Sequence, residues 1–220
     1  RGGASFNGFI NNVRSAAIGR LGADEKKALL AAGSLKNSPA PGMLTQLPKP
    51  KGPGKEWTTK NVLPAVEKGL VGRDFEHGKK MFAAAKCFVC HRFDGQGGAA
   101  GPDLTAAAGR FSKSDLLESI LDPGKVVSDQ YRATIFILKN GKTVTGRIVN
   151  GGGDNFSVNT NMLTPSRNSG VNHKQILKTM PAKGSMMPAG LLNPLNKEEV
   201  LDLVAYLLSM GKSDHAMFKQ

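Results

Sequence analysis

The residues whose types and spacing most clearly indicate a chemical role are the only two cysteines of the chain, Cys87 and Cys90, and the histidine that follows them, His91. Two thiols three positions apart on a helical turn can each form a thioether with one of the two vinyl groups of a porphyrin. The next residue can then bind the iron as its proximal ligand. The spacing therefore predicts a covalent site for one haem c, with His91 on the iron.

Two other uses of a Cys-x-x-Cys pair are a structural zinc site and a thioredoxin-like redox centre. A structural zinc ion needs about four protein ligands, and the chain has no further cysteine to complete such a set. A thioredoxin-like motif is expected beside a βαβ pattern, which is missing here, and it gives His91 no role. Both alternatives are therefore less favoured than haem attachment.

Composition and charge indicate a folded domain with a basic extension. The 220 residues, 40% of them hydrophobic, leave room for one domain of ordinary size and an additional segment. The formal net charge is +13, and residues 1–60 hold ten Lys/Arg against three Asp/Glu. Such a field attracts acidic protein partners or anionic surfaces. Nucleic acid is not favoured, because the lysines are scattered, aromatic residues are few and no binding motif is present.

The expected location is periplasmic or otherwise extracytoplasmic, because haem is normally attached through cysteines outside the cytoplasm. No stretch approaches the ~18 apolar residues that indicate a transmembrane segment. The sequence starts at Arg1 without an apolar leader, which we interpret as a processed protein or a fragment of a longer one.

The sequence pattern divides the chain into three parts. Residues 1–56 are expected to form a basic N-terminal extension that ends in a Pro/Gly/Lys-rich linker. Residues 57–212 are expected to form the haem domain, and 213–220 a C-terminal tail. Within the extension, helices are predicted from the spacing of Phe6, Phe9, Ile10 and Val13, and from Ala23 to Ala32 with Gly33 as the stop.

Three helices are predicted in the domain from their capping signals. Thr58 or Thr59 can cap a short helix through Val66, and Asp74 can begin a helix that runs to about Ala85 and delivers the chain into the cysteine pair. Asn196 begins the last helix, with Glu199 at the capping-box position and Gly211 as the C-terminal stop.

A small β insert is predicted at about residues 131–179, between the helical parts. Its first two strands, 131–138 and 143–149, flank Asn140-Gly141, which favours a type I′ hairpin turn. A third strand carries Phe156 and Val158, and a fourth short strand is possible at 175–177. Residues 168–174 are expected to be a polar loop.

The domain resembles class I cytochromes c. Gly78, Phe82 and Tyr206 are similar to the residues at which the N-terminal and C-terminal helices of that family cross. Gly101-Pro102-Asp103-Leu104 resembles the segment whose proline carbonyl accepts the Nδ1 proton of the proximal histidine. The resemblance implies a mainly α, class I cytochrome c fold, here with an inserted small antiparallel β subdomain, and places Pro102 and Leu104 in the haem environment.

The sixth iron ligand is expected to be a methionine. Thioether sulfur binds haem iron and raises its reduction potential, and residues 185–190 resemble the methionine-proline loop of class I cytochromes. Met187, directly before Pro188, is the better candidate and Met186 the reserve; the alternative is that one or both pack in the core. His173 could in principle bind the iron, but its polar surroundings indicate a solvated histidine.

Two further residues are candidates for the haem environment. Arg110 follows the Gly101-Pro102 turn at a position where class I cytochromes often place a basic partner of a haem propionate. Tyr131 offers a hydroxyl group at the entrance to the β insert. Arginine suits carboxylates well, although a solvated arginine is an equal alternative.

A more specific resemblance is to the haem-binding modules at the C-terminal end of large secreted proteins, often after a dehydrogenase-like β-propeller. It covers residues 57–210 and does not cover residues 1–56. The segments that carry it are Arg73-Asp74-Phe75, Met81-Phe82, Cys87 to Phe93, Gly101 to Thr105, Leu116 to Pro123, Gln130-Tyr131, Asn140-Gly141, Gly146 and Met187-Pro188. The resemblance implies a cytochrome that exchanges electrons with a dehydrogenase.

Two functions from different classes remain open. The first is a monohaem electron carrier, which is not an enzyme, with His91 and Met187 as axial ligands and an acidic redox partner. The second is a haem-based catalyst or small-gas sensor, peroxidase-like in its chemistry, with a labile sixth ligand. A methionine-proline loop is present and no distal acid–base pair of the peroxidase kind is recognised, so the sequence favours the carrier. The β insert is expected either to fill space or dock another domain, or to take part in the redox role.

Overall fold

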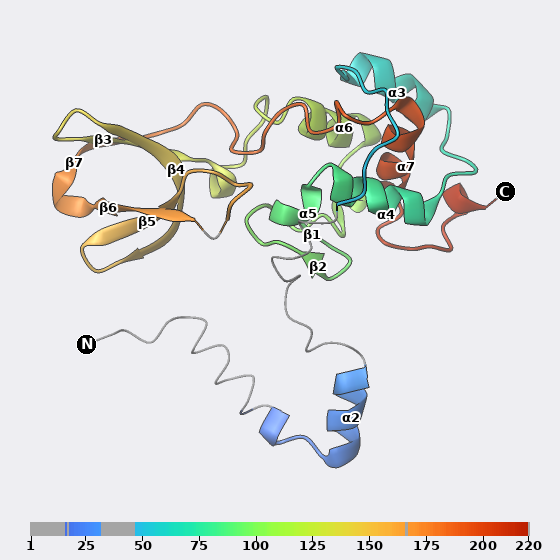
Figure 1. Cartoon of the computed structure of the whole chain (residues 1–220), viewed down its shortest axis with the longest axis horizontal. Helices are drawn as coiled ribbons and strands as arrows, with labels where there is room; N and C mark the ends of the chain where they lie inside the picture. Colours follow the sequence, from blue (N-terminus) through green and yellow to red (C-terminus); the bar gives the residue numbers. More distant parts are fainter. Residues whose placement is uncertain (1–15, 17, 32–46, 166, 220) are drawn as a thin grey trace. The chain divides into compact units, whose positions relative to one another are not determined.

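A computed structural model of the chain describes residues 16, 18–31, 47–165 and 167–219 (Figure 1). The chain divides into two compact units, the second of which begins at Pro41. The first unit contains the helix α2 (Ala23–Ala31), which matches the helix predicted there. The helical pattern predicted between Phe6 and Val13, and the stop predicted at Gly33, lie outside the described residues.

The first helices of the second unit begin where their capping residues predict. In α3 (Thr59–Glu67) the Thr58 side chain accepts a hydrogen bond from a backbone N–H of the first turn. In α4 (Phe75–Ala84) the Asp74 carboxylate does the same. These caps satisfy N–H groups that have no partner within the helix, so local sequence alone fixes both starting points.

The last helix, α7 (Lys197–Leu208), is closed at its start by a reciprocal capping box. Asn196 accepts from the backbone N–H of Glu199, and the Glu199 carboxylate accepts from the backbone N–H of Asn196. Gly211 has a φ of +81°, the left-handed conformation that glycine allows after a helix end. The predicted start and stop of this helix are both present.

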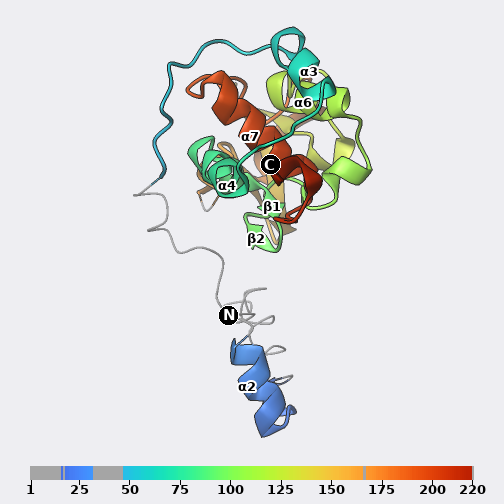
Figure 2. The same ribbon diagram turned by 90° about the vertical axis from the view of Figure 1, so that its right-hand side faces the viewer.

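Helices α4 and α7 cross at Gly78, which is too tightly packed for any side chain. A Cβ atom on Gly78 would lie 2.8 Å from Cβ of Tyr206 and closer still to the backbone oxygen of Asp202. The Tyr206 ring also contacts Phe75 and Phe82, with ring centroids 5.2 and 5.9 Å away. The crossing that the resemblance implies for Gly78, Phe82 and Tyr206 is therefore present, and Figure 2 shows the two helices side by side.

The core of the helical part lies between α3, α4, α6 (Lys113–Leu121) and α7. The remaining short elements are α5 (Cys87–Cys90), the two-stranded ribbon β1 (Arg92–Phe93) and β2 (Gln96–Gly97), and 3₁₀ turns at Ala107–Gly109, Asp129–Tyr131, His173–Gln175 and Ala216–Phe218. The largest side chains that the helical core encloses completely are Phe93, Leu117, Leu192, Leu195 and Leu203.

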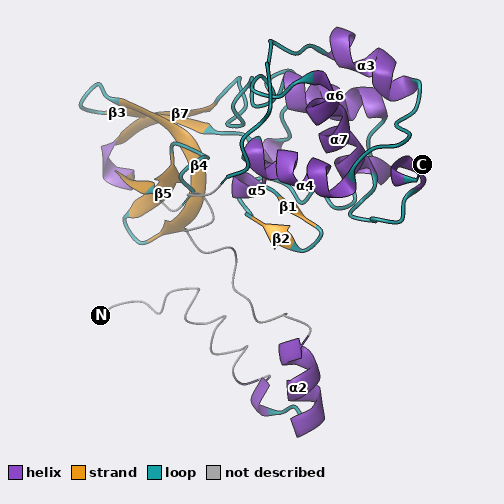
Figure 3. Ribbon diagram, turned by 45° about the vertical axis from the view of Figure 1, so that its right-hand side comes forward, coloured by secondary structure: helices purple, strands orange, loops and turns teal. Residues whose placement is uncertain are grey.

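The β insert is a five-stranded antiparallel sheet with strand order β6-β5-β4-β3-β7 (Figure 3). Its strands are β3 (Thr134–Leu138), β4 (Thr143–Gly152), β5 (Asn155–Asn159), β6 (Asn168–Asn172) and β7 (Ile176–Pro181). The sheet has its own small core of Phe136, Leu138, Val158 and Val171. A separate apolar cluster explains why the insert is a subdomain rather than a loop of the helical part.

The turn between β3 and β4 differs from the predicted type I′ turn. That turn needs φ > 0 at both central residues, whereas only Gly141, with a φ of +81°, has a positive value here. The backbone N–H groups of Gly141 and Leu138 donate to Leu138 and Lys142 oxygens at 2.9 and 2.8 Å. This is the pattern of a three-residue loop with a left-handed glycine at its end, which leaves Asn140 in an ordinary conformation.

The edge strands of the sheet also differ from the sequence prediction. Residues 168–172 form β6 instead of the expected polar loop, because pairing with β5 gives their backbone groups partners. Only Val171 of this strand is buried, so β6 has almost no hydrophobic pattern. The short strand predicted at 175–177 is present but extends to Pro181 as β7, whose residues are mostly exposed.

The expected mainly α class is not evident from the described residues, of which 35% are in helices and 19% in strands.

The segments before and after the helical part also contact it. The backbone N–H groups of Lys51 and Gly52 donate to the Glu199 carboxylate at 2.5 and 3.4 Å. At the other end, the backbone N–H of Arg73 donates to Met217 O at 2.8 Å. Both the linker before Trp57 and the C-terminal tail thus pack on the helical part.

Candidate haem site

The cysteine pair lies on a single helical turn that a left-handed residue separates from α4. Lys86, directly before α5, has a φ of +60°. The turn closes with a hydrogen bond of 2.9 Å from the backbone N–H of His91 to Cys87 O, after which His91 is extended. The backbone therefore holds both thiols and the following imidazole within one short segment.

The imidazole of His91 is held by a backbone carbonyl. Its Nδ1 atom lies 2.8 Å from the oxygen of Pro102. Because a carbonyl oxygen can only accept, Nδ1 carries the proton and Nε2 keeps its lone pair. Burial lowers the pKa of His91, and the hydrogen bond to Pro102 opposes this effect only in part. The ring is therefore neutral at pH 7, with Nε2 available as a donor to a metal.

Glycines allow the loop that contains Pro102 to approach the imidazole. A Cβ atom on Gly101 would lie 2.7 Å from Cε1 of the His91 ring. The backbone N–H of Gly101 donates to Cys90 O at 2.7 Å, and that of Gly98 to Phe88 O at 2.8 Å. The ring is therefore fixed in orientation by the Pro102 hydrogen bond and in position by contact with Gly101.

The environment of the two thiols is unlike that of a thiol–disulfide redox centre. Burial raises the pKa of Cys87 to about 12, and burial also raises the pKa of Cys90. Redox-active cysteines have a lowered pKa, which provides the thiolate. The burial of the pair is thus compatible with a structural or cofactor-attaching role.

The donor set fits haem c better than a bare metal ion. Across the described ranges, no three His, Cys, Asp or Glu side chains lie together in a way that could hold a metal ion. What the site offers is two thiols on one turn, one neutral imidazole, and the partly buried apolar side chains of Phe88 and Leu104, which pack against the helical core. A porphyrin with two vinyl groups and an iron matches this combination.

Arg110, predicted as a propionate partner, lies on the surface near the same loop. Its guanidinium group donates to Asp103 O at 3.3 Å, and the residue is exposed. Leu104 is held by a hydrogen bond of 2.8 Å from its backbone N–H to Arg92 O. The structure thus brings Leu104 and Arg110 to the Pro102 loop, and their contact with haem stays a prediction.

One residue beside this site, Arg147 on β4, was not predicted from any sequence pattern. Its guanidinium group lies 4.9 Å from the centre of the Tyr131 ring and donates a hydrogen bond to Ala100 O. The contact joins residues 47 positions apart, so no local pattern could reveal it. Tyr131, which was predicted from the sequence, is thereby linked to the loop that holds His91.

Met187 lies in the segment between β7 and α7, which is anchored at both ends. Ala182 donates its backbone N–H to Ala133 O at 2.9 Å, and Leu192 is buried in the helical core. Met186 and Met187 are both partly buried. Among the hydrogen bonds and aromatic contacts of the described residues, none links Met187 to His91, so its role as sixth ligand stays a prediction.

His173 belongs to the sheet rather than to the helical part. Its ring centroid lies 4.3 Å from that of Phe156, and the residue follows β6 directly in the chain.

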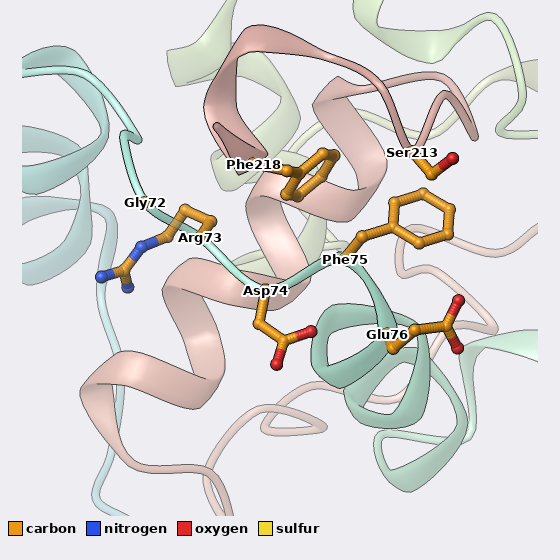
Figure 4. A pocket seen from close by; sticks show the side chains of 7 residues that line it. All are labelled: Gly72, Arg73, Asp74, Phe75, Glu76, Ser213 and Phe218. Carbon is orange, nitrogen blue, oxygen red and sulfur yellow. The ribbon is translucent and has the colours of Figure 1, made fainter. Parts of the chain in front are cut away.

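A surface depression of about 540 Å³ lies between the start of α4 and the C-terminal segment (Figure 4). It is lined by Gly72, Arg73, Asp74, Phe75, Glu76, Ser213 and Phe218 and includes none of the predicted haem residues.

Comparison with known families identifies part of the chain. A family model described as Cytochrome c matches residues 75–136, from the start of α4 into β3. The chain therefore contains a cytochrome c domain, whose family binds haem c covalently and is typically extracytoplasmic or periplasmic. No curated protein matches the chain. No helix in the described part of the chain is long and apolar enough to span a membrane.

Proposed function

We propose that this protein carries single electrons with one haem c, attached through Cys87 and Cys90 and ligated by His91 and Met187. The observation that supports this most directly is the 2.8 Å contact between His91 Nδ1 and Pro102 O. It provides a neutral, oriented imidazole directly after the two thiols. One attachment motif in a chain with two cysteines supports a single haem.

Each residue of the proposed site has a defined task. When bound, haem c would supply an iron centre that takes up and releases one electron. Cys87 and Cys90 hold the porphyrin, while Pro102 and Gly101 keep the His91 ring in one orientation, which limits structural change between oxidation states. The thioether of Met187, braced by Pro188, favours a higher potential than a second imidazole would.

The proposed partner is a redox protein with an acidic docking surface, and an upstream dehydrogenase-like domain is one candidate. Charge counts support an acidic partner. Residues 131–183, which contain the sheet, hold eight Lys/Arg and one Asp/Glu, whereas residues 57–130 and 184–219 together hold thirteen of each. The positive charge of the domain is thus concentrated on the β insert, where it would speed encounter with an acidic surface. We place the protein outside the cytoplasm, in keeping with its family.

Spectra and ligand binding test this function in the protein with haem attached. We expect a low-spin spectrum in both oxidation states, slow or weak uptake of carbon monoxide by the reduced form, and rapid electron exchange with small mediators. The physical reason is that carbon monoxide must displace a thioether held by a proline-braced loop. Hydrogen peroxide turnover should be negligible.

Covalent attachment is tested separately. In Cys87→Ser/Cys90→Ser, acidified organic solvent should extract any haem, whereas none should be extracted from the unmodified protein. Rapid stoichiometric binding of carbon monoxide, together with peroxide turnover well above that of free haem, would contradict the carrier and favour a catalyst or gas sensor.

A further inference from the structure

A side chain of the inserted sheet holds the loop that orients His91. Arg147, on β4, donates a hydrogen bond to the carbonyl oxygen of Ala100. Ala100 is followed directly by Gly101, which packs against the His91 ring, and then by Pro102, whose carbonyl oxygen accepts the hydrogen bond from Nδ1 of His91. The guanidinium group is therefore hydrogen-bonded to the same short segment that fixes the imidazole.

A second part of the insert reaches the cysteine pair independently. The loop between β5 and β6 places the carbonyl oxygen of Met162 3.0 Å from Sγ of Cys90. This loop is itself held from within, because the buried Asn159 side chain donates to Thr164 O and Arg167 O at 3.2 and 3.0 Å. Two separate segments of the sheet thus contact the attachment motif and its supporting loop.

The charge of Arg147 is not neutralised by a neighbouring carboxylate. In the described part of the chain no salt bridge includes this residue, and its guanidinium group contacts a carbonyl oxygen and the face of the partly buried Tyr131 ring. Arg147 is itself partly buried, so solvent screens its charge less than that of a surface lysine. A cation close to a redox centre favours the state with one more electron, since that state is the less positive one.

We propose that the β insert is a working part of the haem site and that Arg147 is the positioning residue through which it acts. The Arg147 side chain fixes residues 100–102 against His91, and its charge raises the reduction potential of the bound haem. This inference rests on the proposed function as a haem c electron carrier. It assigns the sheet a redox role in place of a purely structural one.

Two substitutions of Arg147 and one control test the proposal in the protein with haem attached. Arg147→Gln removes the charge and the guanidinium contacts, whereas Arg147→Lys keeps the charge. Lys139→Gln removes one charge from an exposed residue at the β3–β4 turn of the same sheet. The measurements are the reduction potential, by equilibrium titration, and amide hydrogen exchange at residues 98–101.

We expect Arg147→Gln to lower the potential by more than Lys139→Gln does, and to accelerate exchange of the Gly101 amide, which donates to Cys90 O. Arg147→Lys should have a reduction potential close to that of the unmodified protein, because the charge is kept. Exchange of the Gly101 amide should still increase, because an ammonium group cannot stack on Tyr131 as a planar guanidinium does. Should Arg147→Gln fail to accumulate with haem, the exchange rate of Arg147→Lys decides the outcome.

Equal potential shifts in Arg147→Gln and Lys139→Gln, or unchanged exchange at residues 98–101 in the Arg147 variants, would overturn the proposal and leave the sheet as a scaffold. Failure of the proposed function looks different, because the unmodified protein would then lack covalent haem or would bind carbon monoxide rapidly. Hydrogen exchange would still report on the contact between Arg147 and Ala100 in either case.

Discussion

The Nδ1 atom of His91 lies 2.8 Å from the carbonyl oxygen of Pro102, although the two residues are eleven positions apart. This contact selects one tautomer of the imidazole and leaves Nε2 free to bind iron. It depends on the loop between the two residues, which approaches the ring so closely that glycine is required at position 101.

The first prediction concerns that close approach. In Gly101→Ala the added methyl group would lie 2.7 Å from the His91 ring, so the ring or the loop must move. We expect a destabilisation of about 1–3 kcal/mol and a shifted reduction potential, measured by denaturant unfolding and redox titration. Gly109→Ala is the control, because a Cβ atom there meets no atom within 4 Å. Equal effects of the two substitutions would contradict a tight contact with His91.

The second prediction concerns the sixth ligand. Met187→Ala should abolish the weak methionine-to-iron absorption at the red end of the spectrum of the oxidised protein and open the iron to carbon monoxide. Met186→Ala should leave both properties unchanged, because Pro188 braces the residue directly before it. If the band is lost in Met186→Ala and kept in Met187→Ala, the ligand is Met186.

The third prediction concerns the crossing of α4 and α7. Gly78→Ala would place a methyl group 2.8 Å from Cβ of Tyr206 and against the backbone of Asp202, so the helices must separate. We expect the free energy of unfolding to fall by about 1–3 kcal/mol, measured with denaturant. The matched substitution Gly170→Ala, in the exposed β6 where a Cβ atom meets nothing within 4 Å, should have little effect.

The fourth prediction concerns the pH dependence of stability at Glu199. Burial raises the pKa of its carboxyl group, but hydrogen bonds from the backbone N–H groups of Asn196, Lys51 and Gly52 outweigh burial, and His77 adds a smaller effect, so the net pKa is lowered from 4.5. A lowered pKa in the folded state means that the ionised group stabilises the fold above pH 4.5. That contribution is lost as the pH falls through the folded-state value.

Glu199→Gln should therefore be less stable than the unmodified protein by about 2 kcal/mol at neutral pH, because hydrogen bonds to a charged acceptor are replaced by weaker ones. The difference should narrow as the pH falls below 4.5. Thermal unfolding between pH 7 and pH 3 measures both curves. A difference that stays constant over this range would show that the carboxylate charge is not involved.

The fifth prediction concerns encounter with an acidic redox partner. Electron transfer to such a partner should slow as the salt concentration rises, since salt screens exposed charges. Lys174→Glu, on the β insert, should slow the reaction more than Lys60→Glu in α3, although both lysines are exposed. Stopped-flow kinetics at several ionic strengths provides the comparison. Equal slowing would indicate that the net charge matters and that the insert does not direct docking.

Much of the helical part is predictable because its signals are local. The helix starts at Thr58, Asp74 and Asn196 depend on side chains that bond to their own first turn. The glycine at the α4–α7 crossing is recognisable only through its place in a known family pattern. The sheet is less predictable, and β6 was missed because an edge strand with one buried residue has no clear alternation of polar and apolar side chains.

The proposed attachment motif is readable from the sequence alone, since Cys87, Cys90 and His91 lie within five consecutive positions and the prediction depends on their spacing. The surroundings of that motif depend on tertiary structure. The contacts of Arg147 with Ala100, of Met162 with Cys90 and of Lys51 with Glu199 join residues 47, 72 and 148 positions apart. Such pairs leave no local pattern, because each depends on how separately formed elements pack, and only folding brings their partners together.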